Sequence, residues 1–62
     1  MNMSKITTVC YNEEVVWSSR ENAKAFFLEA MKHTEGAEHD RYSQIYTKLC
    51  CGDDYCTDEG DN

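Results

Sequence analysis

Residues 18–31, SSRENAKAFFLEAM, decide the fold, because they combine a helix start with a long apolar stripe. Ser18 can accept a hydrogen bond from the amide three residues on while Glu21 reaches back to it, as in a capping box. The apolar residues that follow recur at helical spacing: Ala23, Phe26, Phe27, Ala30 and Met31. The stretch therefore predicts an amphipathic helix that ends near Thr34, with Gly36 as its stop.

The residues before this helix, 5–18, predict a β-hairpin. β-Branched and aromatic residues cluster on both sides of a polar break at Asn12 and Glu13. With these two residues as the loop, Cys10 faces Val15, and one face of the hairpin belongs to the core. That face holds Ile6, Thr8, Cys10, Val15 and Trp17, and the other holds Thr7, Val9, Tyr11, Glu14, Val16 and Ser18. A longer loop shifted by one residue stays open as an alternative, and it would exchange the two faces.

A second helix is predicted over residues 37–50. Its apolar stripe consists of Tyr42, Ile45, Tyr46, Leu49 and Cys50. Gly52 is placed to end it, and the short joint makes the two helices antiparallel neighbours. Leu28 widens the apolar arc of the first helix to about 200°, against about 140° for the second. The first helix is therefore expected to lie between the hairpin and the second helix.

These elements give an α+β fold, a β-hairpin followed by two antiparallel helices in the order ββαα. Residues 1–52 form one small domain, and residues 53–62 form an acidic C-terminal tail. In an alternative, residues 55–57 add a short third strand near Tyr55, and in either case residues 58–62 are expected to be a loose tail. A single domain of 62 residues buries about 60% of the surface of its unfolded chain, so its stability is modest.

The net charge of −6 lies entirely in the second half of the chain. Residues 1–34 balance four acids with four bases, whereas from Glu35 onward eight acids face only Arg41 and Lys48. So few bases disfavour direct nucleic-acid binding. No apolar run is long enough to cross a bilayer, and the first residues lack the pattern of a signal peptide. We therefore expect a cytoplasmic protein without membrane contact, whose cysteines stay thiols.

Cysteine and histidine do not show the spacing of a metal site. Cys50 and Cys51 are adjacent, Cys56 lies five residues further on, and the sequence contains no C-x2-C pair. The carboxylates near Cys51 and Cys56 also make these thiols poor nucleophiles. We expect no enzymatic activity, no cofactor and no bound metal. A structural module stapled by a metal is kept as an alternative.

Two surfaces are candidates for binding a partner. The first is the second face of the hairpin, where Val9, Tyr11 and Val16 are expected to stand exposed together. The second is acidic and consists of Asp53, Asp54, Asp58 and Glu59. The expected partner is a protein, and the chain itself is expected to be a monomer or a weak homodimer. The alternative is a nucleic-acid mimic, whose carboxylates imitate a phosphate row and inhibit a basic enzyme of host defence or DNA processing.

A set of short motifs supports a resemblance that covers most of the chain after the first strand. The motifs are Ser19-Arg20-Glu21, Ala23-Lys24, Phe26-Phe27-Leu28, Glu35-Gly36, Arg41-Tyr42, Ile45-Tyr46, Gly52, Tyr55-Cys56 and Asp58. In these the chain resembles a group of short uncharacterised proteins of integrative and conjugative elements in gut Firmicutes. The resemblance brings no activity, cofactor or catalytic residue. It implies residence on a mobile genetic element such as a conjugative transposon, and so an accessory or regulatory role in transfer or the inhibition of host defence.

Overall fold

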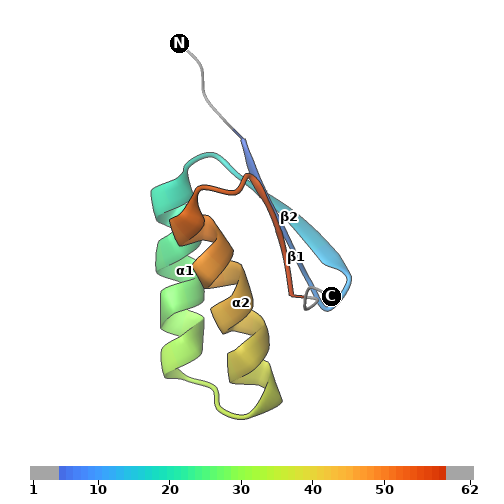
Figure 1. The fold of residues 1–62 in the computed structure, drawn as a ribbon, viewed down its shortest axis with the longest axis vertical. Coiled ribbons are helices and arrows are strands. Elements are labelled where there is room, and N and C mark those ends of the chain that lie inside the picture. The colour runs from blue at the N-terminus through green and yellow to red at the C-terminus, as the bar shows by residue number, and fades with distance from the viewer. Residues whose placement is uncertain (1–4, 59–62) are drawn as a thin grey trace.

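The computed structural model describes residues 5–58, which form three strands and two helices in the order ββααβ (Figure 1). The elements are β1 (Ile6–Cys10), β2 (Glu13–Trp17), α1 (Arg20–Lys32), α2 (Ala37–Cys51) and β3 (Tyr55–Thr57). The predicted α+β fold is confirmed, in the version that has a third strand.

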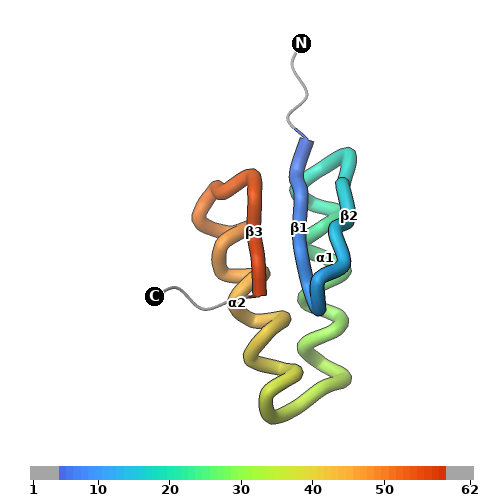
Figure 2. The backbone as a smooth tube through the Cα atoms, turned by 90° about the vertical axis from the view of Figure 1, so that its right-hand side faces the viewer, coloured from blue at the N-terminus to red at the C-terminus, as the bar shows by residue number. Residues whose placement is uncertain are grey.

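β1 is the central strand of the sheet, whose order is β2-β1-β3 (Figure 2). β2 runs antiparallel to β1, whereas β3 is parallel to β1 and reaches it only after both helices. The Thr7 amide donates to the Asp54 carbonyl at 2.9 Å, and the Asp58 amide donates to the Val9 carbonyl at 3.1 Å. Residues 53–58, assigned to the tail by sequence, therefore complete the sheet. The expected loose tail is wrong for Asp58, and residues 59–62 lie outside the described residues.

The hairpin turn begins one residue earlier than predicted. Tyr11 and Asn12 form it with φ values of 54° and 66°, and two positive φ values are what a type I′ turn requires. The predicted pairing of Cys10 with Val15 is wrong, because Cys10 pairs with Glu13. Since the loop keeps two residues, each partner shifts by two positions, and the strand residues keep their predicted faces. Tyr11 leaves the strand and with it the second face.

Tyr11 adopts its positive φ because distant residues hold it there. Few residues other than Gly, Asn and Asp adopt this conformation, so the local sequence favours neither Tyr11 nor Glu13 as the second loop residue beside Asn12. In the structure the Tyr11 amide donates to Asp58 Oδ2 at 3.1 Å. The Arg41 guanidinium also lies 4.7 Å from the centre of the Tyr11 ring. Asp58 and Arg41 are distant from Tyr11 in the sequence, so the sequence pattern around the turn cannot predict either contact.

The helix ends follow the predicted signals with small shifts. Ser19, not Ser18, is the N-cap of α1, and its hydroxyl accepts from the Asn22 amide at 3.1 Å. Gly52 ends α2 in the left-handed conformation with φ of 100°, as predicted. Gly36, expected to end α1, instead precedes α2 as its N-cap, with φ of 74°.

Both helices pack side by side on one face of the sheet, with α1 on the side of β2 and α2 on the side of β3 (Figure 2). The core between the layers contains Ile6, Ala23, Phe27, Ile45, Leu49 and Cys56. The prediction that α1 lies between the hairpin and α2 is therefore wrong. β3 widens the sheet enough for α2 to pack against it directly. The wide apolar arc of α1 is left partly uncovered, and Phe26 is 51% exposed.

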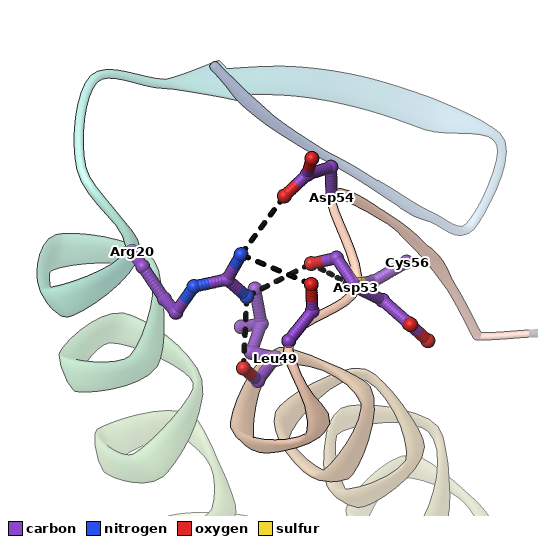
Figure 3. Close-up of polar contacts among 6 residues, drawn as sticks. Arg20, Leu49, Asp53, Asp54 and Cys56 are labelled. Atoms are coloured by element: carbon purple, nitrogen blue, oxygen red, sulfur yellow. Dashed lines mark hydrogen bonds and ion pairs between the residues drawn. The ribbon is translucent and has the colours of Figure 1, made fainter. Parts of the chain in front are cut away.

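Arg20 joins the start of α1 to the end of α2 and to the entry of β3 (Figure 3). Its Nη1 donates to the carbonyls of Leu49 at 2.8 Å and Asp53 at 2.9 Å. Its Nη2 donates to the Gly52 carbonyl at 3.3 Å and to Asp54 Oδ1 at 2.8 Å. The last carbonyls of a helix have no partner within the helix and lie at the negative end of its dipole. One cation therefore satisfies the end of α2 and fixes the direction in which the chain enters β3.

Replacing Phe27 tests the core. Phe27 is 2% exposed and its ring contacts Trp17, Phe26 and Tyr42. Phe27→Ala should cost about 3–5 kcal/mol in the free energy of unfolding, which is measured by urea titration. The matched control is Phe26→Ala in the same helix, which should cost about 1 kcal/mol because half of that ring is already in water. Equal losses for the two variants would contradict the packing described here.

Replacing Arg20 by Lys tests how β3 is held. Lysine keeps the charge but lacks the planar fork that reaches several acceptors at once. Cys56 of β3 is fully buried, so its alkylation by iodoacetamide, followed by peptide mass spectrometry, reports the undocking of β3. Arg20→Lys should speed this alkylation by about 5- to 30-fold. This is the increase in the fraction of molecules with β3 undocked that a loss of about 1–2 kcal/mol in the stability of the docked state causes. Lys32→Gln, at an exposed site of α1, serves as the control and should leave the rate unchanged.

Candidate protein-binding site

An apolar groove runs between β2 and α1 on the helix side of the sheet. Its volume is 350 Å³, and residues from both layers line it: Thr8, Cys10, Tyr11, Glu13, Val15, Trp17, Phe26, Phe27 and Tyr42. We call it the β2 groove. It exists because α1 covers β2 incompletely, which leaves Val15 40% exposed although that residue faces the helices. The Trp17 ring packs against Phe26 and Phe27, with ring centres 5.3 and 6.1 Å away.

The opposite side of the sheet has no helix over it within residues 5–58 (Figure 1). We call this side the outer face. Strand alternation places six residues on it: Thr7, Val9, Glu14, Val16, Tyr55 and Thr57. Val16, Thr7 and Tyr55 form one row across the three strands, and Val16 and Tyr55 are 57% and 61% exposed. These exposed apolar side chains make the outer face a candidate for binding a partner.

The structure brings together only part of the predicted hairpin surface. Val9 and Val16 are diagonal neighbours on the outer face, and Val9 is half-buried. Tyr11 is 53% exposed but lies in the turn beneath Arg41, away from that row. Tyr55 joins the outer face through β3. Tyr55 is exposed and the next residue, Cys56, is buried, so the face on which Tyr55 lies follows only from the strand itself.

The predicted acidic residues are partly occupied within the chain. Asp54 pairs with Arg20 at 2.8 Å, and Asp58 pairs with Arg41 at 2.7 Å with only 6% of its side chain exposed. Asp53 is exposed, and its carbonyl accepts from Arg20. Glu59 lies outside the described residues. Asp54 and Asp58, which are predicted to face a partner protein, thus form ion pairs with arginines of the same chain.

Asp58 is held as an anion in a buried position. Burial by itself would raise its pKa, but the hydrogen bonds from the Tyr11 amide and the Arg41 guanidinium outweigh burial. The pKa of Asp58 is therefore lowered from its ordinary value. The same three groups fix the hairpin turn, which leads directly into β2 and the groove.

Two of the four cysteines, Cys10 and Cys56, have the properties of structural cysteines. All four are free, with Cys50 and Cys51 exposed. Burial raises the pKa of Cys56, and Asp53 raises it further; burial also raises the pKa of Cys10, with Asp58 adding to it. A raised pKa keeps a thiol protonated and weakly nucleophilic. Within residues 5–58, no group of three or more His, Cys, Asp or Glu is placed to hold a metal ion.

Comparison with known proteins adds nothing to this geometry, because no protein-family model, curated protein or solved structure matches the chain. Neither α1 nor α2 has the length and apolar character that a membrane-spanning helix needs. The site is therefore interpreted from its residues alone.

Asp58→Asn tests the anchor of the hairpin turn. A carboxyl group whose pKa is lowered in the fold stabilises it above its ordinary pKa, and this stability is lost as the pH falls through the lowered value. At pH 7 the melting temperature of the variant should be lower than that of the parent by about 4–8 °C. This is the shift that a loss of about 1 kcal/mol in the free energy of unfolding causes in a domain of this size. The gap should narrow as the pH falls below the ordinary pKa of aspartate, in thermal melts followed by circular dichroism. Glu35→Gln, at an exposed position, should show no such gap, and a gap for Asp58→Asn that does not narrow in acid would contradict the anchor.

Proposed function

We propose that the chain is a small non-enzymatic protein that binds another protein through the surface around β2. The observation that carries this proposal is the exposure of apolar side chains on both sides of one edge strand. Val16 is 57% exposed on the outer face, while Val15 and Phe26 are 40% and 51% exposed at the β2 groove. A small domain with a modest core gains most by burying such residues, and a partner protein offers a way to do so.

The chemistry of the groove supports binding over catalysis. Its lining is mostly aromatic and aliphatic, and the Thr8 hydroxyl already accepts a hydrogen bond from Trp17 Nε1 at 2.9 Å. The one thiol at the groove, Cys10, has a raised pKa because of burial and the nearby Asp58. An enzyme site needs a nucleophile or a base poised near neutral pH, and these groups do not supply one.

The nucleic-acid mimic is the second candidate, and the ion pairs support it less. A mimic needs unpaired carboxylates that replace phosphates, whereas Asp54 and Asp58 are paired with Arg20 and Arg41. We propose the cytoplasm as the compartment, since the exposed Cys50 and Cys51 remain thiols there. An accessory or regulatory role on a mobile element rests on the resemblance of the sequence alone.

Photo-crosslinking tests the proposed function. With benzoylphenylalanine at position 16, the chain should capture a protein from extract of its native cell. In competition, unlabelled parent should block this capture, whereas unlabelled Val16→Lys should block it about 10-fold less well. The matched control is Thr47→Lys, which adds the same charge at an exposed position of α2 and should compete like the parent. Capture that both variants block equally would refute the site.

Salt and DNA separate the two candidate functions. Binding through apolar residues should survive a rise from about 50 to 200 mM salt, because such contacts are not screened. A nucleic-acid mimic should lose its partner over this range and to added DNA. Loss of capture under both conditions, together with equal competition by Val16→Lys and the parent, would favour the mimic over the β2 surface.

A further inference from the structure

β2 has a free edge that nothing within residues 5–58 covers with backbone hydrogen bonds. It pairs with β1 on one side only, and none of the turn, loop and cap hydrogen bonds reaches its other side. Alternate residues of such a strand direct their N–H and C=O groups away from the sheet. Natural edge strands are usually blocked by proline, a bulge or charged side chains, lysine above all; over residues 13–17, EEVVW, β2 has no proline, bulge or lysine, and its charged residues are Glu13 and Glu14. The other edge strand, β3, is only three residues long.

The β2 groove lies along this same edge. A strand added beside β2 would continue the sheet over α1, and its side chains would alternate between the groove and the outer face. Side chains on the groove side would meet Glu13, Val15, Trp17 and Phe26, and those on the other side would meet Glu14 and Val16. One added strand would therefore cover both sides of β2.

Charge selects the occupant. Glu13 and Glu14 begin the strand, and neither is within 4 Å of a basic group among residues 5–58. In an antiparallel pair of two β2 strands centred on Val15, the two Glu14 side chains would be diagonal neighbours on one face. A parallel pair would place identical acids opposite each other, and each copy also carries a net charge of −6. A second copy of the chain is therefore disfavoured, and a basic strand is favoured.

We infer that β2 binds an extended segment of the partner protein as a fourth strand, and that this segment alternates apolar residues with Lys or Arg. The inference rests on the proposed function and specifies its partner. The backbone of the segment pairs with the free edge, its apolar side chains fill the β2 groove, and its basic side chains lie beside Glu14. Backbone hydrogen bonds provide the affinity, while the β2 groove and the glutamates of β2 determine which sequences bind.

A designed peptide tests this mode of binding. The probe is acetyl-Lys-Val-Lys-Val-Lys-Val-Lys-amide, titrated into the labelled protein and followed by amide chemical shifts. Shifts should concentrate at Glu13–Trp17 and at Phe26. A second peptide with an N-methyl group on every residue has the same charge and side chains but lacks the N–H donors that a strand in either direction would offer to β2, and it should bind at least 10-fold more weakly. Equal binding of the two peptides would show ionic attraction alone and would overturn the inference.

Charge variants provide the matched control. Glu13→Lys with Glu14→Lys should weaken the lysine peptide by at least 10-fold. Glu35→Lys with Glu38→Lys changes the net charge equally at exposed positions beyond the sheet, and it should weaken the peptide much less. Equal weakening by both pairs would show that only the net charge matters, and would overturn the inference.

Other outcomes separate the inference from the proposed function. Without peptide, the amide chemical shifts of β2 could change with protein concentration while sedimentation shows a dimer. That result would overturn the inference, because the strand bound at β2 would come from a second copy of the chain. Crosslinking at position 16 that succeeds while neither peptide shifts β2 would refute strand addition and leave the proposed function standing. Peptide binding at β2 without any crosslinked protein would refute the proposed function, and the edge would then be a strand acceptor without a cellular partner.

Discussion

The fold depends on the placement of one guanidinium group. Arg20 is the first residue of α1, yet its acceptors are the last carbonyls of α2 and the residues that lead into β3. The Gly52 amide also donates to the Leu49 carbonyl at 3.2 Å, and Arg20 adds a charged donor at the negative end of α2 that orients residues 52–54 as the chain enters β3. With β3 in place, the sheet is wide enough for both helices to share one face. The incomplete cover of β2, and hence the β2 groove, follows from this arrangement.

The local elements could be predicted from sequence, whereas their assembly could not. Both helices and the stop at Gly52 follow from periodicity and end signals within a few residues, which is where such patterns carry information. The turn at Tyr11 could not be found this way, because Asp58 stabilises it from 47 residues away. The order of packing was missed for a related reason: a strand of three residues, Tyr55–Thr57, is too short to show a pattern, yet it determines the width of the sheet.

The candidate site could be predicted only in part. The rest was missed because it depends on contacts between segments that are distant in the sequence. Strand alternation placed Val9 and Val16 on one face, and that survives the change of register because partners moved by two positions. Phe26 belongs to the predicted apolar stripe of the first helix, and helical spacing does not show how far a neighbouring element covers that stripe. Asp58 was counted as a surface charge, since composition does not show that Arg41 lies against it.

The sheet topology has a consequence for the chain during its synthesis. β1 is among the first described residues to be made, but its second neighbour, β3, emerges after everything else in the sheet. A nascent chain therefore presents β1 with an open side until residues 55–57 leave the ribosome, and open strands pair readily with other chains. Closing a loop of this length is also slower than forming the hairpin or the helices. The fold completes after translation of β3, and the species before it, a hairpin with two helices and a bare central strand, is the one that chaperones and proteases would meet.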